Sequence, residues 1–242
     1  MADNGIDDRG MNIEKMRSLG KKLIEKYADE PVDAYIIEKV SGVPGTSDVN
    51  SAGCSPIGID LKLWPTFEDK RMYHVTTLDL RTTPKLLGKI ETKPRAVSLF
   101  ISDPNIHEAD RPGTRETRLV YLDDSNIESG VVAENPPQNS DFRLIEPCTF
   151  VCHEISLPET LYDPNFGEKY IGEVEHEPMN ELYELVCGCS MAGGKPIWYY
   201  SNYYEGKPFS DILILQINEE LVDMNMGDAG SFYVFQNTAF CQ

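Results

Sequence analysis

Two pairs of cysteines are the residues whose type and spacing first suggest chemistry. Cys148 and Cys152 have three residues between them, and Cys187 and Cys189 have one. Structural zinc usually takes cysteine pairs with two to four residues between them, so a mixed site built from these four is one interpretation. However, Cys148 and Cys152 lie in a strand-like run, where residues four apart share a face. Free cysteine packs as a small apolar side chain, so we expect buried thiols, no metal and no cofactor.

The histidines and carboxylates could instead support acid–base catalysis, which needs a histidine and a carboxylate that meet in space. The sequence contains no Gly-x-Ser-x-Gly elbow and no phosphate-binding Gly-x-x-x-x-Gly-Lys-Ser/Thr loop, and we assign no catalytic residue. If a cleft lies between two halves of the fold, its polar groups are His74 and Asp79, from one expected strand, and Asp228, from a glycine-rich turn. An enzyme or small-ligand-binding protein of unassigned chemistry that uses these groups is the alternative function.

An aromatic segment suggests binding and not catalysis. Residues 198–204 read Trp-Tyr-Tyr-Ser-Asn-Tyr-Tyr, which is more aromatic than one strand needs for its core. Tyrosine and tryptophan are enriched in binding surfaces because they combine apolar area with a polar tip. The segment is either a strand edge packed on a helix or a contact surface. The predicted partner-binding residues, which include an acidic rim, are Trp198, Tyr199, Tyr200, Tyr203, Tyr204, Glu205, Asp211, Glu219 and Glu220.

The net charge of the chain is −18, from 22 basic and 40 acidic residues. Such a surface repels nucleic acid and anionic lipid headgroups. It suits a basic protein partner because complementary charge raises the encounter rate, although acidity also aids solubility alone. No apolar run reaches the roughly 18 residues that cross a bilayer. The N-terminal residues lack the basic and apolar regions of a secretory signal, so we expect a cytoplasmic protein.

The elements that must position these residues follow from periodicity and turn residues. Apolar residues three and four apart predict a helix over residues 12–27, which Asn12 caps, and a short helix over 180–186, which Gly188 ends. Residues 41–52 and 158–177 are rich in turn-forming residues and predict irregular structure. Runs of β-branched and aromatic residues predict strands at 32–40, 72–80, 96–101, 118–122, 142–145, 150–157, 212–217 and 232–235.

An internal repeat relates two parts of the chain. The first part has Gly58, Trp64 and strands over 72–80 and 96–101; the second has Gly194, Trp198 and strands over 209–217 and 231–235. The two tryptophans of the chain occupy the same place in each unit. The predicted fold class is therefore α+β, with mostly antiparallel sheets, an internal duplication, an N-terminal helix and a short helix before the second repeat. We expect one compact domain in which residues 1–53 form the helix and lead-in, residues 54–242 form the duplicated unit, and both copies close one core.

The order of motifs in the second unit resembles the YwqG-like family, a widespread bacterial family of unknown function. Gly-Gly-x-Pro-x-Trp ends at Trp198, a Leu-x-Leu-Gln-Ile strand ends at Ile217, and Met-x-x-Gly-Asp-x-Gly ends at Gly230 before an aromatic strand. The first-unit counterparts are Trp64-Pro65, residues 77–80 and residues 97–101.

The resemblance covers roughly residues 54–236. Asn225-Met226 stands where the family has a tryptophan before Gly-Asp, and Leu78 stands where the first half of the family has glutamine. The resemblance implies a mixed, mostly antiparallel α+β fold with an internal duplication. Family members often occur in bacterial loci that encode polymorphic toxins, so the resemblance also implies an immunity role. Together with the acidity and the missing catalytic motifs, we therefore expect a non-enzymatic immunity protein that binds a basic secreted toxin.

Overall fold

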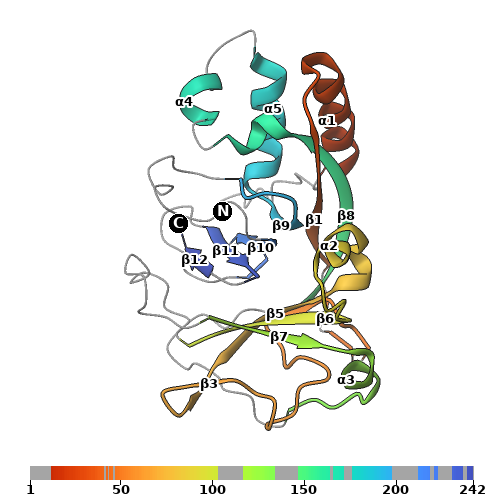
Figure 1. Ribbon diagram of the computed structural model, residues 1–242, viewed down its shortest axis with the longest axis vertical. Helices are drawn as coiled ribbons and strands as arrows, with labels where there is room; N and C mark the ends of the chain where they lie inside the picture. Colours follow the sequence, from red (N-terminus) through yellow and green to blue (C-terminus); the bar gives the residue numbers. More distant parts are fainter. Residues whose placement is uncertain are drawn as a thin grey trace, which may run out of the picture.

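A computed structural model of the chain describes most of the sequence (Figure 1). The described residues are 12–40, 42, 44–45, 47–102, 117–133, 147–163, 166–171, 176–197, 212–218, 221–222, 231–236 and 239–241. None of the helices within these ranges is both long enough and apolar enough to cross a membrane.

The first described element is helix α1 (Ile13–Tyr27), which confirms the predicted helix and its cap. The side chain of Asn12 accepts a hydrogen bond from the backbone N–H of Lys15 at 2.9 Å, which satisfies one of the free donors at the helix start. The apolar face of α1 is buried, and Gly20 lies on that face. A Cβ atom at Gly20 would lie 2.5 Å from the carbonyl oxygen of Ser156, so only glycine lets the helix approach the sheet this closely.

Ten strands of the described residues form one sheet, whose named strand pairs are antiparallel. From edge to edge, the strands are β12 (Ala239–Cys241), β11 (Ser231–Phe235), β10 (Leu213–Asn218), β9 (Ser190–Gly193), β1 (Pro31–Val40), β8 (Cys148–Pro158), β2 (Ser51–Ala52), β5 (Tyr73–Asp79), β6 (Ala96–Ile101) and β7 (Thr117–Leu122). A separate hairpin contains β3 (Thr66–Phe67) and β4 (Lys70–Arg71). The α+β fold with mostly antiparallel strands is therefore confirmed.

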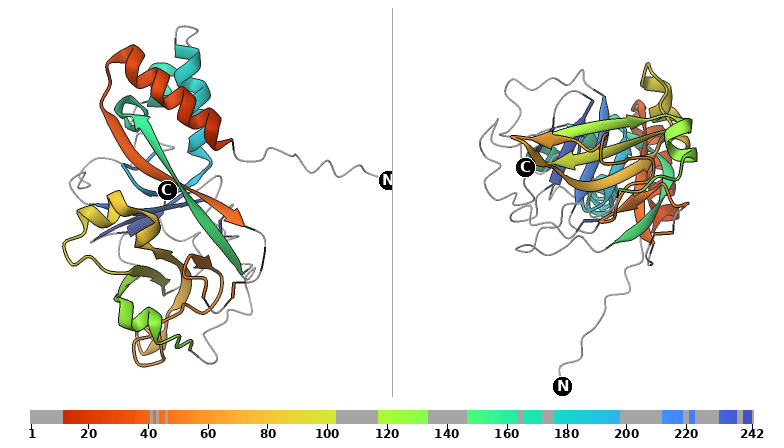
Figure 2. Two further views of the ribbon diagram at one scale, coloured as in Figure 1. Left: turned by 90° about the vertical axis from the view of Figure 1, so that its right-hand side faces the viewer. Right: turned by 90° about the horizontal axis from the view of Figure 1, so that it is seen from below.

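The order of the strands has the same pattern when it is followed from either edge. The strands β10, β11 and β12 form one wing of the sheet, and β5, β6 and β7 form the other. The short strand β9 joins the first wing to the long strand β1, and the short strand β2 joins the second wing to the long strand β8. The long strands β1 and β8 pair over their whole length, from Pro31 opposite Pro158 to Val40 opposite Thr149 (Figure 2). β1 precedes β5 in the chain, but in the sheet it is joined through β9 to the wing of β10. Residues 31–40, which we expected to belong to a lead-in, therefore lie at the centre of the sheet. A duplicated unit would produce this pattern, and the duplication itself stays a prediction.

The two wings bury their apolar faces against each other. Val75, Leu78 and Val97 of one wing belong to the same buried cluster as Ile214 and Ile217 of the other. Figure 1 shows the two wings as separate layers, with β10, β11 and β12 above β5, β6 and β7. Buried side chains from both predicted units therefore share one apolar cluster.

The helices cover the remaining faces of the sheet. α1 and α5 (Glu177–Cys187) pack together, and with α4 (Phe166–Tyr170) and the 3₁₀ turn η3 (Glu159–Tyr162) they enclose a second apolar cluster. α5 ends at Gly188, as predicted. α2 (Pro84–Lys89), which follows the turn η1 (Leu80–Thr82), packs beside β9, and α3 (Asp124–Glu128) follows β7. Two expectations of irregular structure were incomplete, because β2 lies within 41–52, and η3 and α4 lie within 158–177.

Candidate functional site

The structure locates only part of the predicted site. The predicted partner-binding residues from Trp198 to Glu220 lie outside the described residues, and so does Asp228 of the alternative ligand cleft. His74 and Asp79, the other two residues of that cleft, are described, and both belong to β5.

β5 presents His74 and Asp79 on the same face of the sheet. An irregularity between His74 and Thr76 shifts the register of β5 against β6 by one residue. As a result, His74, Thr77 and Asp79 pair with alternate residues of β6, which all point to one face. The bulge therefore brings the side chains of His74 and Thr77, three residues apart, into contact.

The imidazole of His74 has a hydrogen-bond partner at each nitrogen. Nδ1 lies 2.5 Å from the carbonyl oxygen of Cys54, and Nε2 lies 2.9 Å from the hydroxyl oxygen of Thr77. A carbonyl oxygen only accepts, so Nδ1 carries the proton and Nε2 accepts from the hydroxyl of Thr77. The hydroxyl of Ser98 lies 2.7 Å from that of Thr77 and donates to it, since the proton of Thr77 is already used.

Burial lowers the pKa of His74 from 6.5 to about 4, against the opposing effect of the hydrogen bond to Cys54. The imidazole is therefore neutral at physiological pH. A hydroxyl that is hydrogen-bonded to an imidazole, which is in turn oriented by a third group, is also the arrangement that activates a hydroxyl nucleophile. However, Thr77 is 1% exposed and Ser98 is fully buried, so substrate does not reach either hydroxyl in this conformation. The network holds the segment after β2 on β5 and is a structural feature.

Asp79 is engaged with its own neighbours. One carboxylate oxygen accepts from the backbone N–H of Arg81 at 3.0 Å and caps η1, and the other accepts from the guanidinium of Arg95 at 2.7 Å. The side chains of Asp79 and Arg95 are only 11% and 18% exposed. Within the described residues, the hydrogen bonds of His74 and Asp79 run to different partners. The structure therefore does not combine them into an acid–base pair.

Cys54, Cys148, Cys152, Cys187 and Cys189 do not form disulfides. Cys148 is buried in the core between the wings, and Cys152 packs against the same cluster from the same strand. Burial raises the pKa of Cys152 to about 11, and burial also raises the pKa values of Cys54 and Cys187. In the part of the chain that the structure describes, no three His, Cys, Asp or Glu side chains come together to hold a metal ion.

Two buried side chains hold the residue that precedes the predicted aromatic surface. The side-chain oxygen of Gln216 on β10 accepts from the backbone N–H of Ile197 at 2.9 Å. The hydroxyl of Tyr233 on β11 donates to the carbonyl oxygen of Ile197 at 2.8 Å. Gln216 and Tyr233 are fully buried, so the wing of β10 fixes the chain directly before Trp198. The sequence pattern did not identify these two positioning residues, because they read as ordinary members of strands.

The structure also exposes a group of apolar residues that the sequence analysis did not select. Leu61, Leu63, Val131 and Val132 are 40%, 48%, 41% and 42% exposed, and we call them the Leu–Val patch. The signal in the sequence was weak because Leu61 and Leu63 precede Trp64 in a segment without strand periodicity.

The described residues form an acidic α+β protein in which the hydrogen bonds of His74 and Asp79 join segments of its own chain. No model of a known protein family matches the chain, and a search of curated proteins found no match.

Proposed function

We propose that this protein is a non-enzymatic binding protein that neutralises a basic secreted toxin, which is the role of an immunity protein. The observation that carries the proposal is the net charge of −18. A charge of this size accelerates encounter with a basic partner through long-range attraction and opposes binding to nucleic acid or anionic lipid. An inhibitor that must reach its target before the target acts benefits from such acceleration.

The distribution of charge along the sequence supports the predicted partner surface. The stretch 219–230 contains Glu219, Glu220, Asp223 and Asp228 and contains no lysine or arginine. It follows the aromatic segment 198–204 in the same unit of the predicted repeat. An aromatic centre with a charged rim is the usual composition of a protein-binding surface. The resemblance to the YwqG-like family, whose members often occur beside toxin genes, favours the same function.

The alternative function, an enzyme or small-ligand-binding protein, has less support. It requires polar groups that are free to meet a ligand. His74 is neutral with both ring nitrogens bonded, and Asp79 is occupied by Arg81 and Arg95. The third residue of that cleft, Asp228, lies outside the described residues.

Co-expression with the protein encoded by the gene immediately upstream tests the proposed function. Cells that produce the upstream protein alone should stop growing, and co-expression of this chain should restore growth. The two proteins should elute together from a size-exclusion column and separate as salt is raised, because salt screens the attraction. Failure to restore growth against a toxic neighbour would refute the proposal.

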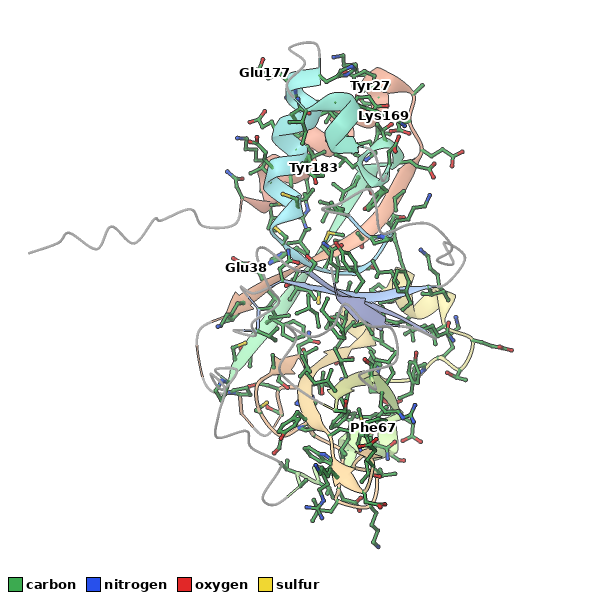
Figure 3. All side chains as sticks on the ribbon, turned by 90° about the vertical axis from the view of Figure 1, so that its left-hand side faces the viewer. Tyr27, Glu38, Phe67, Lys169, Glu177 and Tyr183 are labelled. Carbon is green, nitrogen blue, oxygen red and sulfur yellow. The ribbon has the colours of Figure 1, made fainter. Side chains whose placement is uncertain are left out.

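Substitutions in the aromatic segment test the predicted surface. Replacing Tyr199, Tyr203 and Tyr204 with serine should weaken the complex by about 100-fold or more, since buried interface tyrosines are frequent hot spots. Tyr27→Ser is the matched control, because Tyr27 is an exposed tyrosine at the end of α1, on the helical end of the molecule (Figure 3). Unchanged affinity in the triple variant would remove the aromatic segment from the interface.

A further inference from the structure

The pair Cys187 and Cys189 is a motif of the sequence that the proposed function does not use. Helix α5 ends at Cys187, Gly188 follows as its cap residue, and Cys189 directly precedes β9. Cys187 is partly exposed, whereas Cys189 is only 6% exposed. Their thiols donate to two neighbouring carbonyl oxygens in the last turn of α5, from Cys187 to Glu184 at 3.7 Å and from Cys189 to Leu185 at 3.2 Å. Both sulfur atoms therefore lie at the same end of α5.

The backbone at this end of α5 brings the two cysteines within reach of a disulfide. Gly188, which separates them, has nearly helical dihedral angles, with a φ of −81° and a ψ of −4°. Residues two apart in helical backbone have Cα atoms about 5.4 Å apart, which follows from a rise of about 1.5 Å per residue and a radius of about 2.3 Å. Disulfides span Cα separations of about 4.4–6.8 Å. The separation therefore suits a disulfide, and the remaining requirement is that the two Cβ atoms turn toward each other.

Gly188 is the residue that permits this turn. Apart from its neighbours in the chain and its own helix, no atom lies within 4 Å of a Cβ built at Gly188, so the space beside it is open. Glycine also adopts backbone conformations that are costly for other residues. A ring that is closed by Cys187 and Cys189 contains the backbone of only three residues, so it needs this freedom at its middle residue.

Ring closure changes a contact that holds α5 on the sheet. The side-chain amide of Asn218 donates to the carbonyl oxygens of both Cys187 and Cys189, each at 3.0 Å. Rotation of the peptide group that follows Cys187 turns the first of these oxygens away from Asn218. The side-chain oxygen of Asn218 accepts from Ser231 on β11, and its backbone N–H donates to the hydroxyl of Ser190 at 2.9 Å. Asn218 therefore connects the two cysteines to the wing of β10.

We infer that Cys187 and Cys189 form a reversible disulfide that weakens the contact between α5 and the wing of β10, and so act as a redox-sensitive switch. The oxidant is a low-molecular-weight disulfide such as glutathione disulfide. The thiolate of Cys187 attacks one of its sulfur atoms, the sulfur–sulfur bond breaks and one glutathione thiolate leaves. The thiolate of Cys189 then attacks the sulfur of Cys187 and expels the second glutathione. Each leaving thiolate takes up the proton that the attacking cysteine has lost, so the protein loses two hydrogens and two glutathione thiols form.

Incubation of the folded chain in mixtures of reduced and oxidised glutathione tests the disulfide. After acid quenching and alkylation, cleavage after glutamate releases the fragment 185–205, which contains Cys187, Cys189 and no other cysteine. This fragment should lose two hydrogens, in proportion to oxidised glutathione divided by the square of reduced glutathione. Because burial raises the pKa of Cys187, the rate should rise about tenfold per pH unit near neutrality. A fragment that stays reduced, or that only carries bound glutathione, would overturn the inference.

Cysteine variants locate the reaction. Cys189→Ser should stop at a mixed disulfide between Cys187 and glutathione. Cys187→Ser should react at least about tenfold more slowly, because Cys189 is buried. Cys54→Ser is the matched control, since Cys54 is also partly exposed and burial also raises its pKa. The control should change the rate at the fragment less than about twofold. If Cys187→Ser reacts as fast as the wild type, Cys187 is not the attacking thiol and the inference is wrong.

Substitution of Asn218 tests the coupling to the wing. Because ring closure costs the hydrogen bond from Asn218 to Cys187, Asn218→Ala should raise the equilibrium constant for oxidation by about threefold or more. Ser231→Ala, which removes the hydroxyl that orients Asn218, should act in the same direction and serves if Asn218→Ala does not fold. An unchanged constant in both variants would refute the switch. Oxidation of the wild type that accelerates in urea in step with global unfolding would also refute it, since the cysteines would then react only in the unfolded chain. The inference does not depend on the proposed function.

Discussion

His74 donates a hydrogen bond from Nδ1 to the carbonyl oxygen of Cys54 at 2.5 Å, across a separation of 20 residues in the chain. This bond attaches the segment that leaves β2 to the face of β5. The same bond sets the tautomer of the imidazole, and burial keeps the ring neutral, with a pKa of about 4.

The first prediction is a loss of stability in mild acid. The unfolded chain binds a proton at His74 below a pKa of about 6.5, whereas the folded chain resists protonation down to about 4. The unfolded state therefore binds more protons in this window, and the free energy of unfolding should fall as the pH decreases from 6.5 to 4. The contribution of His74 should be about 3 kcal/mol over the whole window. Urea unfolding at several pH values measures it.

His74→Gln is the control for this prediction. The glutamine amide can still donate toward the carbonyl of Cys54 but does not titrate. This variant should be less stable at neutral pH and should lose less stability than the wild type between pH 6.5 and 4. Parallel pH curves for the two proteins would show that His74 does not cause the acid sensitivity.

The second prediction concerns the contact between α1 and β8. Gly20→Ala should destabilise the protein by about 1–3 kcal/mol, because the new methyl group would press on the carbonyl oxygen of Ser156. Gly88→Ala in α2 is the matched control. Apart from its chain neighbours and the backbone of its own helix, no atom lies within 4 Å of a Cβ built at this position. The control should be neutral or stabilise by up to about 1 kcal/mol through helix propensity. Thermal unfolding of both variants checks the contrast, and equal destabilisation would contradict it.

The third prediction concerns the ion pair of Asp79 and Arg95. Asp79→Ala removes the nearer carboxylate of the largely buried Arg95 guanidinium, which keeps only Asp124 at 3.7 Å, and it also removes the cap of η1, so it should cost at most about 3 kcal/mol. Adding Arg95→Met to Asp79→Ala should recover part of this loss, because the double variant leaves no buried charge unpaired. The exposed pair of Lys15 and Glu181 is the comparison, and its removal should cost at most about 1 kcal/mol. Denaturant titrations arranged as double-mutant cycles give these values.

The fourth prediction concerns the connection between α5 and the wing of β10. The amide nitrogen of Asn218 donates to the carbonyl oxygens of Cys187 and Cys189, each at 3.0 Å. Asn218→Asp replaces this donor with an oxygen that faces two carbonyl oxygens, so the loss of stability should exceed about 3 kcal/mol. The same substitution at Asn126, whose side-chain oxygen accepts a bond at the surface of α3, should cost less than about 1 kcal/mol. Similar losses at both sites would disprove the role of Asn218.

The predicted strands and helices with long, regular patterns correspond to elements of the structure. The helix over 12–27 and the strands over 32–40 and 96–101 are present within one residue of their predicted bounds. The shorter elements β2, β9 and α3 were not predicted. β2 and β9 contain two and four residues, and a run this short carries no periodicity. They become strands because longer neighbours in the sheet supply their hydrogen-bond partners.

The candidate site shows the same difference between what local sequence patterns predict and what pairing between distant residues decides. His74 and Asp79 lie in one strand as the sequence pattern predicts, and their role in a ligand cleft stays a prediction. Their partners Cys54, Thr77 and Arg95 follow from a bulge and from sheet pairing. The aromatic segment 198–204 and its acidic rim remain a prediction from the sequence, because they lie outside the described residues. The Leu–Val patch was missed, because exposure depends on what the rest of the chain covers.

By itself, the sequence determined the acidity of the protein, the type of its long elements and the α+β class, because these depend on composition and on patterns within a few residues. Only the tertiary structure decided that β1 and β8 form the centre of the sheet, that both ring nitrogens of the partly buried His74 are hydrogen-bonded and that Leu61 and Leu63 face solvent. These features depend on contacts between residues far apart in the chain, and local propensity contains no information about such contacts.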